Sequence, residues 1–119
     1  MPNSISFARV DQRSGSTTSP TSAVTAVGTA QVGAASLPGA FNVVTTSVGQ
    51  TAVVLPASYP AYTPLIVRVT SATAGLVFPN SGGTINGGSA NASLSVAQNK
   101  PCVLMVADDG LTWVGVIGA

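Results

Sequence analysis

Hydrophobic and polar residues alternate in ways typical of β-strands from about Val24 to the C-terminus. In the stretch "ASLSVA", Leu94 and Val96 lie on one side and serines on the other, which indicates a half-buried strand. The stretches "LIVRV" (65–69) and "CVLMVA" (102–107) are almost continuously apolar, so we expect both faces of these strands to be covered. Apolar residues at helical spacing are absent, and the chain has no glutamate.

Valine and threonine dominate these stretches, and their branched side chains favour a pleated sheet. Gly, Pro and Asn interrupt them at near-regular intervals, and Asp109-Gly110 is typical of a hairpin turn. No internal repeat is clear enough to indicate a propeller or a solenoid. The predicted fold is therefore all-β, a single antiparallel β-sandwich or short barrel with an extended N-terminal arm. Its strands are expected near Ala30–Gly33, Phe41–Ser47, Ala52–Leu55, Leu65–Thr70, Gly75–Phe78, Ala92–Ala97, Cys102–Ala107 and Leu111–Ile117.

The 119 residues suffice for one domain, which we place at residues 25–119 after an arm or linker at 1–24. The arm ends in "SGSTTSPTS", a linker composition, but apolar residues occur near its start. One interpretation is a tail with incidental hydrophobic residues. The other is an arm that becomes ordered along a partner, with two apolar anchors and charged contacts around them. Its candidate contact residues are Ile5, Phe7, Arg9, Val10, Asp11 and Arg13.

Charge and hydropathy favour assembly with other protein. Only 6% of the residues are charged, whereas 45% are hydrophobic and the mean hydropathy is +0.48. Such a chain must bury apolar surface and has few charges to keep an isolated monomer soluble. The net charge of +1, without clustered Lys and Arg, argues against nucleic acid as a partner. No apolar run is long enough to predict a membrane span, and the N-terminus lacks the pattern of a secretory signal.

Catalytic chemistry has few candidate residues. The chain has no histidine and no glutamate, and its carboxylates are Asp11, Asp108 and Asp109. Histidine acid–base catalysis and the Ser-His-Asp and Cys-His arrangements are therefore excluded. A Ser-Lys pair would need Lys100, which lies beside Pro101 at an expected turn. We predict that the protein is not an enzyme and has no catalytic residues and no cofactor.

Metal ligands are equally scarce. A single cysteine and no histidine exclude a zinc site built by one chain. Asp108 and Asp109 could contribute to a calcium site, but EF-hand spacing is missing and a turn is the preferred interpretation. No metal site is predicted. Cys102, within "PCVLMVA", is interpreted as a buried structural thiol.

The glycine-rich stretch "TINGGSANASLSV" (84–96) raises the question of a phosphate-binding loop. No lysine follows its glycines, as a P-loop requires, and no helix follows as a dinucleotide site requires. The stretch is therefore interpreted as a turn, with Ile85 anchoring it in the core. Asn91-Ala92-Ser93 matches a glycosylation acceptor, which we discount without a secretory signal. Trp113 is expected to be a core or interface anchor whose indole N–H needs a partner.

From Phe41 onward, the chain resembles small structural proteins of tailed bacteriophages. The resemblance lies in "FNVVTTSVGQTAVVLP", in "FPNSGGTINGGSANASLSVA" and in the closing "DGLTW". It implies a capsid decoration (cement) protein or related virion-surface β-module, located on the outer surface of the capsid. Its implied partners are the major capsid protein and further copies of itself, commonly as a homotrimer. The strands with two apolar faces would then bury one face in the core and the other against sister subunits.

A second function stays open: a head- or tail-fibre module that binds a host receptor or glycan. A carbohydrate site usually contains aromatic platforms, and Tyr59, Tyr62 and Trp113 are the only Tyr and Trp residues of the chain. The stretch "SYPAY" is typical of a proline-stiffened loop.

Overall fold

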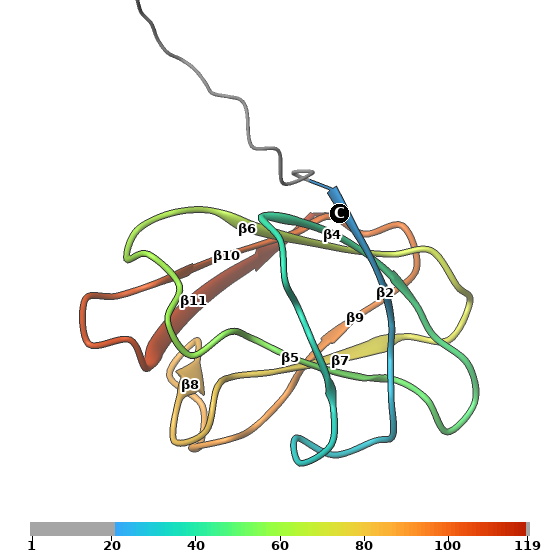
Figure 1. The fold of residues 1–119 in the computed structure, drawn as a ribbon, viewed down its shortest axis with the longest axis horizontal. Coiled ribbons are helices and arrows are strands. Elements are labelled where there is room, and N and C mark those ends of the chain that lie inside the picture. Colours follow the sequence, from blue (N-terminus) through green and yellow to red (C-terminus); the bar gives the residue numbers. More distant parts are fainter. Residues whose placement is uncertain (1–20, 119) are drawn as a thin grey trace, which may run out of the picture.

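The structure is a computed structural model that describes residues 21–118, and every regular element among them is a β-strand (Figure 1). Most of the strands are short, because turn-forming residues interrupt the apolar stretches. In chain order they are β2 (Thr21–Thr25), β3 (Ala35–Ser36), β4 (Phe41–Thr45), β5 (Ala52–Val54), β6 (Leu65–Val69), β7 (Gly75–Phe78), β8 (Thr84–Ile85), β9 (Leu94–Val96), β10 (Cys102–Val106) and β11 (Thr112–Ile117).

The strands form a six-stranded sheet, in the order β2-β4-β6-β10-β11-β8, and a four-stranded sheet, in the order β3-β5-β7-β9. From β2 to β7 the chain alternates between the two sheets, so each turn of the chain adds one strand to each of them (Figure 1). Successive strands within each sheet therefore run parallel, β2 beside β4 beside β6 and β3 beside β5 beside β7. This winding is a β-solenoid.

The last part of the chain pairs differently. β9 lies antiparallel to β7, and β10 lies antiparallel to β6. β11 returns antiparallel along β10 through a turn at the predicted Asp109-Gly110, and β8 lies parallel to β11. Of the two turn residues, Gly110 has a positive φ of 74°. The solenoid formed by β2 to β7 is therefore followed by strands that pair mostly antiparallel and belong to the same two sheets.

The predicted antiparallel sandwich or barrel is wrong. The domain is all-β, but its sheets are mixed and its N-terminal strands are parallel. Parallel strands need a crossover connection, which is usually a helix. Here the crossover is a strand of the opposite sheet, as β5 is between β4 and β6, so the absence of helices did not indicate antiparallel pairing.

Seven of the predicted strands correspond to β4, β5, β6, β7, β9, β10 and β11, with differences at their ends. The prediction at Ala30–Gly33 is wrong, because this segment turns: Ala34 N–H donates to the Gln31 carbonyl and Gly33 has a φ of 86°. β2, β3 and β8 were not predicted. β2 spans the residues on either side of the proposed boundary between residues 24 and 25.

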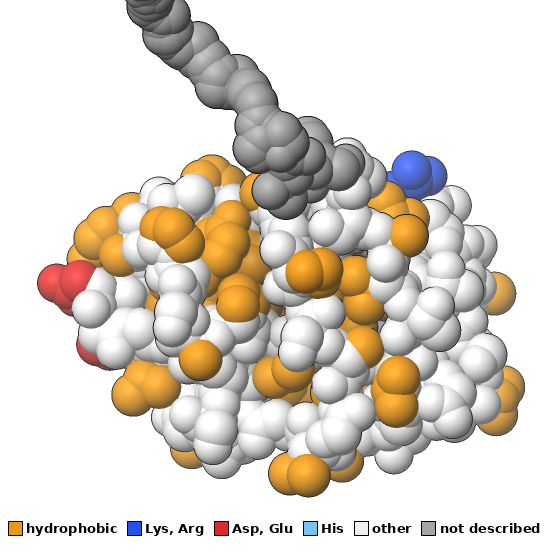
Figure 2. Space-filling view, in the orientation of Figure 1, with side chains coloured by type: hydrophobic (Ala, Val, Ile, Leu, Met, Phe, Trp, Pro, Cys, Tyr) orange, Lys and Arg blue, Asp and Glu red, His pale blue; other side chains and the backbone are white. Residues whose placement is uncertain are grey.

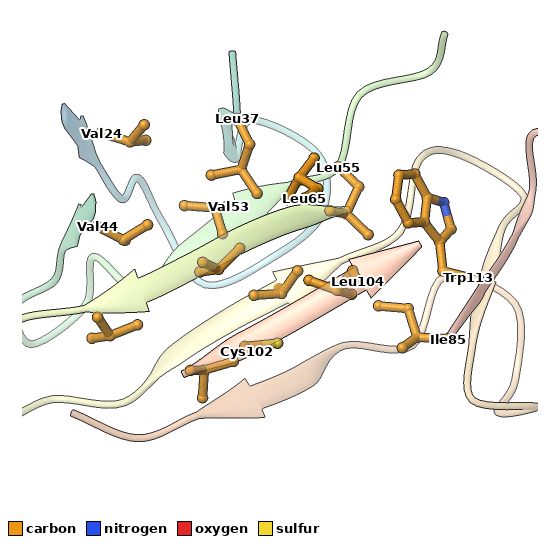
Figure 3. Packing of buried hydrophobic residues seen from close by; sticks show 14 of the residues in the cluster. Val24, Leu37, Val44, Val53, Leu55, Leu65, Ile85, Cys102, Leu104 and Trp113 are labelled. Atoms are coloured by element: carbon orange, nitrogen blue, oxygen red, sulfur yellow. The ribbon is translucent and has the colours of Figure 1, made fainter. Parts of the chain in front are cut away.

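The core lies between the sheets, where side chains from both point into one interior (Figure 3). Val44, Leu65 and Leu104 come from the six-stranded sheet and Val53 from the four-stranded sheet, and all are at most 1% exposed. Side chains along each strand point alternately into and out of this interior. In β6, for example, the inward side chains are buried and Arg68 points out. On β11, Gly115 leaves room for Leu94 and Leu104, since an added Cβ would lie 3.2 Å from a methyl carbon of each.

Candidate functional site

A row of apolar side chains crosses the outward side of the six-stranded sheet. Phe41 of β4 lies opposite Ile66 of β6, and Ile66 lies opposite Val103 of β10. Val103 in turn lies opposite Val116 of β11. The row therefore crosses four adjacent strands, and none of its positions is polar.

A second pair extends this row along the strands. Met105 lies opposite Val114, two residues along from Val103 and Val116 on one side of the row. Val43, two residues along from Phe41, lies on the other side of the row, opposite Arg68. Val114 is 58% exposed and Val116 is 67% exposed, which is unusual for residues within a sheet. We call this surface the outer face; it comprises Phe41, Val43, Ile66, Val103, Met105, Val114 and Val116.

The charged side chains lie at the two ends of the outer face. Arg68 points outward near the end of β6 and donates a long hydrogen bond of 3.4 Å to Asn99 Oδ1, beside Lys100. Asp108 and Asp109 follow the other end of β10. Figure 2 shows acidic side chains at one end of the molecule and a basic side chain near the opposite end. The sheet thus carries positive charge at one end of its strands and negative charge at the other.

Asp109 has a structural role in the β10–β11 turn. Its Oδ2 accepts a 2.6 Å hydrogen bond from the Thr112 hydroxyl, and its Oδ1 accepts the N–H groups of Leu111 and Thr112 at 2.8 and 2.9 Å. These bonds hold the pKa of Asp109 below its ordinary value, and the bond from the Thr112 hydroxyl has the largest effect. The predicted turn at these residues is confirmed, and this carboxylate is already engaged within its own loop.

The glycine-rich stretch that resembled a phosphate loop is a set of turns. The N–H groups of Gly83 and Gly88 donate to carbonyls within three residues, and that of Gly82 donates to Asn91 Oδ1 at 2.7 Å. These amides are therefore not free to hold an anion. Ile85 is 7% exposed and belongs to the core, as predicted.

Trp113 joins this stretch to the core. It is fully buried, and its indole N–H donates a 2.8 Å hydrogen bond to Asn80 Oδ1, which confirms the expected need for a partner. Asn80 Nδ2 in turn donates to the Gly110 carbonyl at 2.9 Å. Further along β11, the Asn86 side chain accepts from the Gly115 N–H and donates to its carbonyl, so it continues the pairing of β8.

The two tyrosines have different surroundings. Tyr59 packs on Trp113, with ring centroids 6.3 Å apart, and its hydroxyl donates to the Pro64 carbonyl. Tyr62 is 62% exposed and has a φ of 59°, which a bulky residue rarely adopts. Its N–H donates to the Val106 carbonyl at 2.8 Å, which fixes the loop beside the end of β10. Of the two, Tyr62 is the more exposed.

The residues described by the structure hold no cluster of three or more His, Cys, Asp or Glu side chains. Cys102 is buried, as expected from its apolar surroundings, and burial raises the pKa of its thiol to about 11. Between residues 21 and 118 there is also no helix that could span a membrane.

The contact residues predicted for the N-terminal arm, Ile5, Phe7, Arg9, Val10, Asp11 and Arg13, lie outside the described residues, and their role stays a prediction. The outer face was not among the predicted site residues. The nearly continuous apolar sequences of β6 and β10 could have indicated it, because they place apolar residues on both sides of the sheet. Within the described part of the chain, one side of these runs is buried and the other is half-buried or exposed.

Comparison with known proteins does not assign the chain to a family. No family model matches it, and neither a curated protein nor a solved structure does. The class that the geometry defines is a small β-solenoid with an exposed apolar sheet face.

Proposed function

We propose that this chain is a non-enzymatic structural protein of a bacteriophage virion, which binds the outside of the major capsid shell and stabilises it. The observation that carries the proposal is that the chain presents the outer face, an apolar surface across four strands of a small β-solenoid, as expected of a protein that works within an assembly. Large exposed apolar surfaces mark sites of protein association. The resemblance from Phe41 onward to virion-surface proteins supplies the kind of assembly.

A decoration role would rest on many modest contacts rather than on one tight contact. Residues 21–118 carry only four charged side chains, Arg68, Lys100, Asp108 and Asp109, so a partner need not be highly charged. A decoration protein present in many copies adds a modest interface at each position, and the shell gains stability from their number. The predicted arm at residues 1–24 would supply the shell contact, and the solenoid would supply contacts around it.

Shell binding can be measured with capsids that lack this protein. Purified full-length chain, added in increasing amounts, should sediment with the shells to a saturating ratio and raise the temperature at which they release DNA. Phe7→Asp should weaken this binding, because it places a charge at an expected apolar anchor. Ser16→Asp introduces the same charge in the linker and serves as the control. Absence of co-sedimentation at any concentration would contradict the proposal.

A receptor-binding fibre module is the second candidate, and the exposed Tyr62 favours it. Strained, exposed residues often lie at ligand sites, and an aromatic ring is a common platform for sugars. Binding to a glycan array that is lost in Tyr62→Ala would support this function. Tyr59→Ala is a poorer test, because Tyr59 packs on the buried Trp113 and its loss also disturbs the core.

A further inference from the structure

The packing within the single chain does not explain the exposed valines of the outer face. Its valines at 103, 114 and 116 are between 37% and 67% exposed, although each lies in a paired strand and none is at a loop tip. Other exposed valines, such as Val32 and Val48, are in turns and stand singly. Among the described residues, the β10–β11 part of the apolar row is therefore open to solvent, at a cost that a protein partner would remove.

The charges around this face are complementary to one another. Arg68 and Lys100 lie at the end where β6 finishes and β10 begins, and Asp108 and Asp109 lie where β10 finishes. One chain therefore carries a basic end and an acidic end, separated by the length of a strand, and each could pair with the opposite end of another chain. A partner of a different kind would need only one half, whereas a second copy rotated relative to the first can satisfy both.

We propose that copies of this chain pack on one another through the outer face, with the Arg68–Lys100 end of one copy beside the Asp108–Asp109 end of the next. A two-fold axis that crosses the strands produces this contact face to face. A three-fold axis that crosses the strands also brings these ends together. In that arrangement the six-stranded sheets of three copies form the sides of a triangle, and at each corner the basic end of one sheet meets the acidic end of the next. Both arrangements close on themselves, as stable oligomers do.

This inference deepens the proposed function, on which it rests for the idea of an assembling virion protein, by naming the partner of the outer face. It leaves the shell contact to the N-terminal arm. Its test needs only the purified full-length chain, so it can fail while shell binding succeeds, and the reverse.

The first experiment is sedimentation velocity of the full-length chain over a range of concentrations. The wild-type chain should sediment as an oligomer, and Val116→Asp and Val103→Asp should each weaken association by about tenfold or more, because each buries an unpaired charge. Val32→Asp is the matched control: its valine is 92% exposed in a turn, and it should associate as the wild type does. A wild-type chain that stays monomeric at all concentrations, or a Val116→Asp chain that associates normally, would overturn the proposal.

The second experiment tests orientation and does not depend on the folding of the apolar variants. Arg68→Asp and Asp108→Arg should each weaken association, and the double variant, which exchanges the two charges, should recover most of it. Asp108 is chosen because Asp109 holds its own turn. Added salt should reduce the difference among these chains, since exposed charges are screened. A double variant no better than the weaker single variant would contradict the proposed arrangement of ends.

Discussion

Trp113 connects three parts of the molecule through one side chain. Its ring is fully buried, it packs on Tyr59, and its N–H reaches Asn80, which is 33 positions away in the chain. The sequence indicated that this tryptophan would be buried and would need an acceptor. It could not indicate Asn80 as the acceptor, because that contact depends on how the loop after β7 returns to β11.

At this scale we predict that Asn80→Ala lowers stability by about 1–3 kcal/mol, because it leaves the buried indole N–H and the Gly110 carbonyl without partners. Ser81→Ala, at an exposed neighbouring position, should have little effect and serves as the control. Chemical denaturation followed by tryptophan fluorescence measures the difference directly. Equal unfolding midpoints for the two variants would show that the Asn80 bonds do not contribute.

At the scale of the element, the β10–β11 turn depends on one carboxylate that is ionised and bonded to three donors. Because hydrogen bonds lower the folded pKa of Asp109, its ionised form stabilises the fold above the pKa that it has when unfolded. This contribution is lost as the pH falls through the lower, folded pKa. Acid should therefore weaken the turn, and neutral pH should preserve it.

We predict that Asp109→Asn melts at a lower temperature than the wild type at neutral pH, and that this gap narrows as the pH falls below about 4. Asp108→Asn, next to it but without these bonds, should show a smaller gap at every pH. Thermal melts followed by circular dichroism between neutral and strongly acidic pH measure both variants. A gap for Asp109→Asn that is independent of pH would show that its ionisation does not support the turn.

The elements predicted best are those whose apolar pattern is bounded by clear turn residues. β6 and β10 were found from almost continuous apolar runs, and the β10–β11 hairpin from Asp109-Gly110. β3 and β8 contain two residues each, too few for any alternation to show. β2 follows a polar linker, and its sequence TSAVT has one buried side chain, Val24, so nothing marks it as a sheet strand.

At the scale of the whole molecule, the pairing of the strands could not be predicted from their patterns. A strand of a solenoid and a strand of a sandwich both bury alternate side chains between two sheets. The distinction lies in which strand stands beside which, and β4 pairs with β2 and β6, neither of which is its neighbour in the chain. The successive turns of the chain from β2 to β7 follow the same path between the two sheets, but their side chains differ, so the sequence contains no clear repeat that would have predicted a solenoid.

Strand pairing in the whole molecule also explains why the sequence predicted the outer face only in part. The apolar runs at 65–69 and 102–107 indicated strands covered on both faces, and sister subunits were expected on one of them. Parallel addition of β4 beside β6, and the return of β11 beside β10, turn these separate strands into one continuous surface. That surface is the physical basis of the proposed assembly.

A cryo-electron microscopy map of the intact virion tests the central claim, attachment to the outside of the capsid, most directly. The account predicts density for this β-solenoid on the outer surface of the shell, in many copies related by the shell symmetry and in contact with the major capsid protein. Density for the solenoid confined to a fibre or the tail, or its absence from the particle, would contradict it.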